Sequence, residues 1–159
     1  MKDMKKLFFV LLIGLMFFIA CKKDEKQDLT NQCVFYDNFL STCFYGLSTP
    51  RYDQIIITDN KTYQNFADSI RIHPYNIKCD TATLPIIDFT KYSLLGKYTG
   101  GGGCSATYYR QILQDKNGKK LIYRIIVQYE GSCSMILASW NWVIIPKLEK
   151  GCFVEFDVN

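Results

Sequence analysis

The sequence predicts an α+β domain, namely an antiparallel β-sheet meander with one amphipathic helix, stapled by disulfides. After residue 21, apolar residues recur at convincing helical spacing in a single stretch. Runs rich in β-branched and aromatic residues follow it, with turn residues between them. A strand, a helix and then successive strands favour the α+β class over repeated βαβ units.

The first strand and the helix are adjacent in the sequence. Tyr52–Thr58 holds three consecutive isoleucines, and this compact run predicts a buried strand. Asp59 and Asn60 then offer an N-cap. The helix should end near Arg71 and bury one apolar stripe. The stripe consists of Tyr63, Phe66, Ala67 and Ile70.

Turn signals divide the rest of the chain into strands. Asn117-Gly118 is the strongest type of short hairpin signal. Tyr123–Gln128 is apolar enough to be a central strand. Gly100–Gly103 breaks the pattern, and we expect a close-packed strand connection there or, alternatively, a loop that contacts a partner. The predicted strands are Tyr92–Tyr98, Ser105–Leu113, Leu121–Tyr129, Met135–Ile145 and Cys152–Val158.

Six cysteines follow Cys21, and an even number predicts three disulfides in an exported chain. With the turn at Asn117-Gly118, facing residues have numbers that sum to about 235. Cys104 and Cys133 come close to this sum, so a small bulge or fray at the open end of the hairpin would pair them. The remaining cysteines would pair as Cys33–Cys43, a local loop, and Cys79–Cys152.

The N-terminal segment has the layout of an export signal. Met1–Lys6 is basic, and Leu7–Ile19 is an uninterrupted apolar run of 13 residues. At about 1.5 Å per helical residue, this run is too short to cross a hydrocarbon core of roughly 30 Å. Ala20-Cys21 closes it and resembles a bacterial lipobox, which implies lipid, such as palmitate, on Cys21. An ordinary cleaved signal is the alternative.

The lipobox resemblance divides the chain into a signal peptide over residues 1–20, a lipidated tether over 21–32 and a single α+β domain over 33–159. Lys23-Asp24-Glu25 resembles the surface-export signal of Bacteroidetes lipoproteins, which implies an outer-membrane protein that faces outward. Two or more acyl chains hold a protein stably on a membrane, and bacterial lipoproteins carry three. Without its signal the chain has a net charge of +2, which excludes a nucleic-acid partner.

No catalytic or metal-binding pattern stands out. His73 is the only histidine, no serine lies in a G-x-S-x-G motif and no C-x-x-C occurs. We therefore expect neither a metal nor a cofactor. A pair of carboxylates for glycoside hydrolysis stays open as an alternative. The candidates would be Asp88, Glu130 and Glu155.

Two aromatic residues are the best candidates for a binding surface. Trp140 and Trp142 lie on the same face of a predicted strand, because strand side chains alternate. With Gly101 and Gly102 they would form a platform for a glycan or peptide. Core burial of at least one indole, with Asn141 turned to solvent, is the favoured alternative.

Two short segments match the Asp-Ser/Thr-apolar pattern. It resembles the O-glycosylation acceptor of Bacteroidetes proteins, and Thr81, in a linker, is the better candidate. Ser69 also fits the pattern but lies in the predicted helix.

Short motifs in the second half suggest a family. They are Ile87-Asp88-Phe89, Leu94-Leu95-Gly96, the glycine-rich segment with Cys104, and Trp142–Lys147. Together they resemble small Bacteroidetes lipoproteins related to the C-terminal domain of PrcB-type protease-complex subunits, over roughly Asp53–Val158. The resemblance implies an α+β fold and an accessory, protein-contacting role, without catalytic residues. The cysteines and the Cys33–Cys43 region depart from this pattern, so no protease partner is inferred.

These observations predict a lipid-anchored envelope protein that acts as a non-enzymatic binding or accessory module for a protein or glycan partner. The alternative is a small envelope hydrolase that acts on glycan or peptide.

Overall fold

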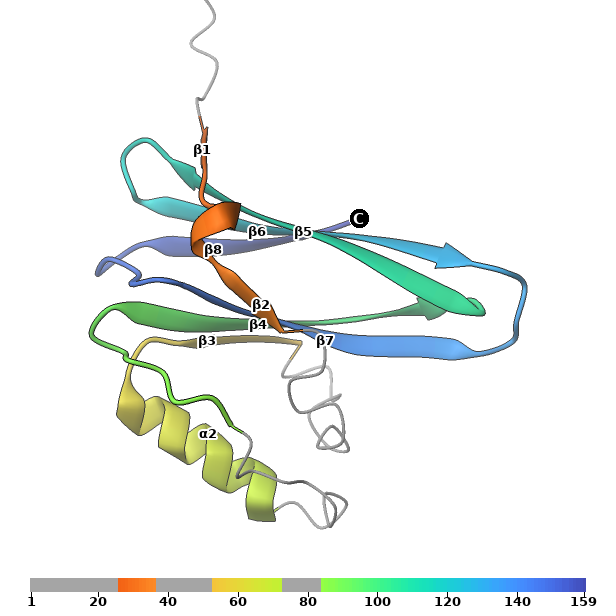
Figure 1. Cartoon of the computed structure of the whole chain (residues 1–159), viewed down its shortest axis with the longest axis horizontal. Coiled ribbons are helices and arrows are strands. Elements are labelled where there is room, and N and C mark those ends of the chain that lie inside the picture. Colours follow the sequence, from red (N-terminus) through yellow and green to blue (C-terminus); the bar gives the residue numbers. More distant parts are fainter. Residues whose placement is uncertain (1–25, 37–52, 73–83) are drawn as a thin grey trace, which may run out of the picture.

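The computed structural model describes residues 26–36, 53–72 and 84–159. Two β-sheets and one helix form three stacked layers (Figure 1). This arrangement confirms the α+β class. The elements are β1 (Lys26–Asp28), the 3-10 turn η1 (Thr30–Gln32), β2 (Val34–Tyr36), β3 (Gln54–Ile57), α2 (Asn60–Ile72), β4 (Tyr92–Gly102), β5 (Ser105–Asp115), β6 (Lys120–Glu130), β7 (Ile136–Pro146) and β8 (Phe153–Val158).

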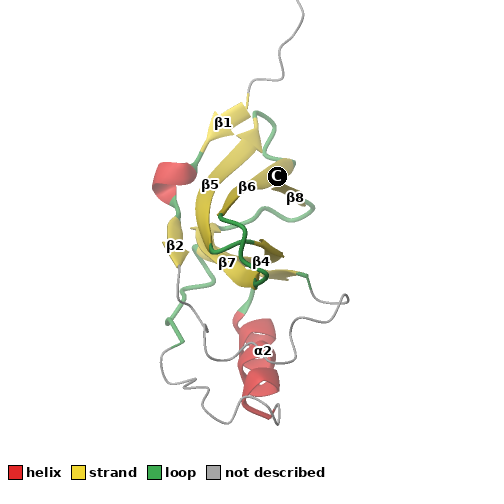
Figure 2. Cartoon of the chain, turned by 90° about the vertical axis from the view of Figure 1, so that its right-hand side faces the viewer, coloured by secondary structure: helices red, strands yellow, loops and turns green. Residues whose placement is uncertain are grey.

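The strands are shared between two sheets. The outer sheet has the order β1-β5-β6-β8, and the central sheet has the order β2-β7-β4-β3. Helix α2 packs on the other face of the central sheet (Figures 1 and 2). The predicted meander is therefore divided, because β4 and β5 follow each other in sequence but pair in different sheets.

Each face of the central sheet has its own core. Between the sheets, Leu95 and Val143 meet Tyr123 and Ile125 of the outer sheet, and all four are fully buried. Toward the helix, the buried cluster is Ile57, Tyr63, Ile70, Ile87, Phe89, Leu94, Trp140 and Trp142. Successive side chains of β4 and β7 point to opposite faces of the central sheet, so both strands contribute residues to both cores.

The β5–β6 hairpin has the predicted turn and register. Ser105 faces Glu130 and Gln114 faces Leu121, so facing numbers sum to 235. Gly118 has a φ of +67°, which a residue without Cβ adopts at little cost. The predicted Cys104–Cys133 disulfide closes the open end, with a Cα–Cα distance of 4.9 Å.

The predicted helix is confirmed. The Asp59 carboxylate accepts hydrogen bonds from the Thr62 N–H and hydroxyl, both at 2.8 Å, as an N-cap should. Tyr63, Ala67 and Ile70 of the predicted stripe are buried, and Phe66 is half-buried.

Two predicted strands differ from the structure. The isoleucine run forms β3, but it is an edge strand in which Ile57 is buried and Ile56 is 42% exposed. The glycine run does not end β4, because Gly100–Gly102 continue the strand opposite Ala138–Ile136 of β7. Pairing with a long neighbouring strand overrides the weak β-propensity of glycine.

Part of the predicted tether belongs to the domain. β1 pairs with β5, and Leu29, which follows it, is only 7% exposed within the core between the sheets. The Leu29 N–H donates to the Ile112 C=O at 2.8 Å. The folded domain therefore begins by Lys26 rather than at residue 33.

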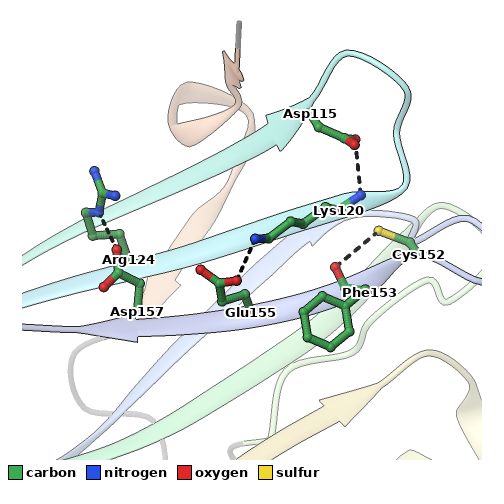
Figure 3. A network of polar contacts seen from close by, with 7 residues as sticks. All are labelled: Asp115, Lys120, Arg124, Cys152, Phe153, Glu155 and Asp157. Carbon is green, nitrogen blue, oxygen red and sulfur yellow. Dashed lines mark hydrogen bonds and ion pairs between the residues drawn. The ribbon is translucent and has the colours of Figure 1, made fainter. Parts of the chain in front are cut away.

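β8 is the one parallel partner among the described strand pairs, running alongside β6. Two ion pairs connect the strands on the solvent-facing side of the outer sheet, as Figure 3 shows. Lys120 contacts Glu155 at 2.6 Å, and Arg124 contacts Asp157 at 2.7 Å. In the described part of the chain, no helix has the length and apolar character needed to cross a bilayer.

Candidate functional site

The two tryptophans are core residues. Trp140 is 2% exposed and Trp142 is fully buried, and their rings stack with centroids 5.1 Å apart. Phe66 of α2 packs against Trp142 at 5.5 Å. Helix α2 thus covers the face on which the indoles lie, so they do not form an exposed platform. The alternative of core burial fits the structure.

The glycines of the proposed platform lie apart from the indoles. A Cβ at Gly101 would be 2.4 Å from the Tyr129 ring, so Gly101 faces the outer sheet. Asn141, between the two tryptophans, also points between the sheets and is fully buried rather than turned to solvent. Gly102, the last residue of β4, pairs with Ile136, the first residue of β7.

A cleft lies where the two sheets separate at one side of the molecule. We call it the edge cleft, and its volume is about 470 Å³. This size falls within the range of about 300–1,000 Å³ that is typical of small-molecule sites. Its lining comes from β4, β6 and the end of β8: Lys97, Tyr98, Thr99, Gly100, Val127, Tyr129, Val158 and Asn159.

Unequal strand lengths create the edge cleft. β4 has 11 residues, whereas its outer neighbour β3 has 4 and reaches only as far as Lys97. β6 likewise has 11 residues, and β8 pairs with it only as far as Ile125. Among the described residues, neither β3 nor β8 therefore extends along the full length of its neighbour at this side of the sandwich.

The cleft rests on a network of polar side chains between the sheets. The Asn141 Nδ2 donates to Thr99 Oγ1 at 3.0 Å, and Arg110 Nε donates to Asn141 Oδ1 at 2.9 Å. A buried amide needs such partners, because an unsatisfied one is costly. The network fixes Thr99 at the bottom of the cleft.

One cation lies in the cleft, and it is neutralised. Lys97 Nζ contacts the Asp53 carboxylate at 2.6 Å and lies 5.8 Å from the centre of the Phe156 ring. The Lys97 side chain is 13% exposed. The cleft is consequently close to neutral, which suits an uncharged ligand surface.

Tyr129 forms a wall of the cleft. Its pKa is raised, mainly because burial disfavours the phenolate, while a side-chain hydrogen bond with Thr99 acts in the opposite direction. The phenol is therefore a neutral donor at physiological pH. The ring lies against Gly101, where any Cβ would collide with it. One glycine of the run thus makes space for this wall, and Gly100 lines the cleft directly.

The candidate carboxylates do not meet. Glu155 pairs with Lys120 on the outer face, beside Ile122. Glu130 lies eight residues further along β6, about 26 Å away at roughly 3.3 Å per residue. Asp88 holds the turn before β4 by accepting a hydrogen bond from the Thr90 N–H at 3.0 Å. No group of three His, Cys, Asp or Glu side chains gathers within the described ranges.

The residues behind the family resemblance have structural roles. A Cβ at Gly96 would be 2.3 Å from the Trp142 ring, so this glycine lets the indole lie flat on β4. Lys147 Nζ donates to the Phe89 C=O at 2.7 Å and also to the Thr58 C=O. It thereby joins the end of β3 to the turn before β4.

Among the cysteines that the structure describes, Cys33 and Cys152 are free thiols. Their predicted partners, Cys43 and Cys79, lie outside the described residues. The pKa of Cys33 is raised to about 11, chiefly by burial and further by the Asp28 charge. Burial also raises the pKa of Cys152. A thiol with a raised pKa is a poor nucleophile, so neither residue has the properties of a catalytic cysteine.

Several other predicted sites also fall outside the described residues. These are the lipidation site Cys21, the O-glycosylation candidate Thr81 and the histidine His73. Ser69, the weaker glycosylation candidate, lies in α2 and donates to the Phe66 C=O at 2.7 Å.

Comparison with known proteins gives no relative: no family model matches the chain, and no curated protein or solved structure is significantly similar to it.

Sequence reasoning missed the edge cleft. Val127 and Tyr129 appeared only as part of an apolar strand, and Val158 as part of the last one. The sequence signal that could have indicated the cleft was the run Gly100–Gly103. It was interpreted first as a close-packed strand connection, and contact with a partner was the alternative. The cleft depends on where β3 and β8 stop relative to β4 and β6, and strand periodicity does not reveal this.

Proposed function

We propose that this chain is a lipid-anchored module of the bacterial outer membrane, exposed at the cell surface, that binds a partner in the edge cleft without catalysing a reaction. The lipobox-like ending at Cys21 supports the anchor, and the charged residues after it support surface exposure. The observation that supports a binding role most directly is the edge cleft, with its volume of about 470 Å³.

The position of the cleft suits an anchored protein. The chain enters the domain through β1, at one edge of the outer sheet, whereas β8 forms the opposite edge. Along β6, Val127 lies six residues beyond Leu121, or about 20 Å at roughly 3.3 Å per residue. Leu121 is level with β1, since it faces Gln114, the partner of Gln27. A partner in the cleft therefore lies away from the entry of the tether.

The chemistry of the cleft favours binding over hydrolysis. Two carboxylates contact residues that line the cleft, but neither lines it: Asp53 is held by Lys97, and Asp157 by Arg124 and the Asn159 side chain. A general acid and base for hydrolysis would need two such groups on either side of a bond. The described lining offers an apolar wall, hydroxyl groups and strand edges instead.

Substitution of Val158 tests the binding role. Val158 lines the cleft and is 41% exposed, so Val158→Arg should fill the cleft with little effect on folding. Phe153→Arg is the matched control, because Phe153 lies on the same strand, is 62% exposed and lies outside the cleft. We expect wild type and Phe153→Arg to bind, and Val158→Arg to bind at least about tenfold more weakly.

The probes are a panel of peptides and of cell-envelope glycans, measured by biolayer interferometry on the full-length chain in detergent. Binding of no member of the panel, or equal binding by Val158→Arg, would contradict the proposed role. Turnover of a glycan or peptide by the wild type would favour the hydrolase instead.

The anchor has its own test. The N-terminal peptide of the mature chain should begin at Cys21 and carry acyl chains when membranes are analysed by mass spectrometry. Cys21→Ser removes the thiol that accepts lipid, so its N-terminal peptide should carry no acyl group. A wild-type N-terminus at another residue, or an unmodified Cys21, would refute the anchor.

A further inference from the structure

We propose that the ligand of the edge cleft is an extended polypeptide segment that adds a strand to β4 beyond the end of β3. This inference rests on the proposed binding function and names its ligand class. Strand addition uses hydrogen bonds to an exposed sheet edge for affinity and pockets for alternate side chains for specificity.

The edge of β4 provides the hydrogen-bonding groups. Gln54, the first residue of β3, faces Lys97, and the Tyr98 N–H donates to the Asp53 C=O at 2.8 Å. Backbone groups of alternate residues point to the same side of a strand. Gly100 and Gly102 therefore direct their N–H and C=O groups to the side of β3, where no described residue pairs with them.

The opposite wall of the cleft, β6, also continues past the last described residue of its neighbour β8. The Asn159 N–H donates to the Ile125 C=O at 3.0 Å, and the Val127 N–H donates to the Asn159 C=O at 2.8 Å. The next groups on this side of β6 are the Val127 C=O and the Tyr129 N–H. Neither has a backbone partner among the described residues. The cleft thus lies between two sheet edges along which no described residue adds a strand.

Several polar side chains of the cleft are already engaged, which favours a peptide over a glycan. Lys97 pairs with Asp53, and Thr99 Oγ1 accepts from Asn141. The Asn159 side chain donates to Asp157 at 3.0 Å. A sugar would need such groups for its hydroxyls, whereas the groups that have no described partner here belong to the backbones of β4 and β6. Backbone groups at a sheet edge match another backbone.

The interior of the cleft suits alternate apolar side chains. Val127 and Val158 line it, together with the Tyr129 ring. Every second side chain of an added strand would point between the sheets onto these residues. Gly100 has no side chain, so a second backbone can approach β4 closely. We therefore expect a segment with aliphatic residues at alternate positions.

Two substitutions at Gly100 distinguish the loss of the backbone N–H from the effect of an added side chain. A Cβ at Gly100 meets no atom nearer than 3.7 Å, so Gly100→Ala keeps both the N–H and the fold. Gly100→Pro removes the N–H, and a strand tolerates proline where that N–H points away from the neighbouring strand, as it does here from β7. The probes are random-sequence peptides displayed on phage and selected on the full-length chain in detergent. The best peptide should bind Gly100→Ala like wild type and Gly100→Pro about tenfold more weakly.

N-methylation of the selected peptide gives a test that does not depend on the folding of any variant. An added strand uses the N–H groups of every second residue only. Methylation of one alternating set should abolish binding, and methylation of the other set should leave it unchanged. Equal effects of both sets, or selection of no peptide, would overturn strand addition.

Failure of this inference is distinguishable from failure of the proposed function. If a glycan binds wild type but not Val158→Arg, while no peptide is selected, the binding role stands and strand addition is wrong. If neither peptides nor glycans distinguish wild type from Val158→Arg, both are wrong.

Discussion

At the scale of single residues, two glycines of β4 make room for aromatic rings because they have no side chain. Gly96 and Gly101 lie on opposite faces of β4. At each of them, a large aromatic ring lies where the Cβ of another residue would be. Trp142 occupies the space at Gly96, and Tyr129 occupies the space at Gly101. One glycine therefore stabilises the helix-side core, and the other shapes the edge cleft.

Gly96→Ala should destabilise the domain by about 1–3 kcal/mol, because the added methyl group overpacks a core without room for it. Its Cβ would lie 2.3 Å from the Trp142 ring. Urea unfolding followed by tryptophan fluorescence measures the change. Gly100→Ala on the same strand is the matched control and should have almost no effect. Equal stability of the two variants would refute the packing described for Trp142.

At the scale of elements, the last strand depends on side chains as well as on backbone pairing. β8 is short, parallel to β6 and at the edge of the outer sheet. The ion pairs Lys120–Glu155 and Arg124–Asp157 reinforce it on the outer face (Figure 3). Exposed pairs of this kind contribute about 0–1 kcal/mol each. Because β8 forms one wall of the edge cleft, its attachment also matters for binding.

The Arg124–Asp157 pair predicts a pH dependence. Its hydrogen bond is the main reason that the pKa of Asp157 is lowered. A lowered carboxyl pKa stabilises the folded state above the unfolded pKa of about 3.9, and this contribution is lost as the pH falls through the folded value. Asp157→Asn should therefore reduce stability at pH 7 by less than about 1 kcal/mol and have no such effect at pH 2. Urea unfolding at both pH values checks this, and an equal loss at both would contradict it.

Features that depend on residues close together in the sequence were predictable from the sequence. The N-cap at Asp59 and the Asn117-Gly118 turn are local signals, and the turn alone fixed the register that brings Cys104 to Cys133. The division into two sheets was not predictable, because β4 and β5 read as successive strands of a meander. A core between the sheets, in which Leu95 and Tyr123 take part, separates them, and its members are distant in sequence.

The two tryptophans show a further limit of sequence reasoning. Alternation placed Trp140 and Trp142 on one face correctly, but both faces of the central sheet are buried. Asn141 therefore lies in a core although the pattern suggested solvent, and its partners Thr99 and Arg110 come from other strands. The polar base of the edge cleft thus depends on contacts between residues far apart in the sequence.

At the scale of the whole molecule, the proposed anchor and the edge cleft lie at different places. In this proposal the tether joins through β1, and the cleft opens at the opposite edge of the outer sheet, about 20 Å further along β6 at roughly 3.3 Å per residue. A protein held in this way leaves its cleft free for a partner at the membrane surface. The anchor would concentrate the module there, so even modest affinity would suffice.

Photo-crosslinking in intact cells tests this account most directly. Val158→p-benzoylphenylalanine places a reactive group in the edge cleft, and Phe153→p-benzoylphenylalanine places it on the same strand outside the cleft. With the full-length anchored chain, we expect one defined adduct from position 158, absent from position 153 and lost when the selected peptide is added as competitor. No adduct from position 158, or the same adducts from both positions, would contradict a partner bound in the cleft.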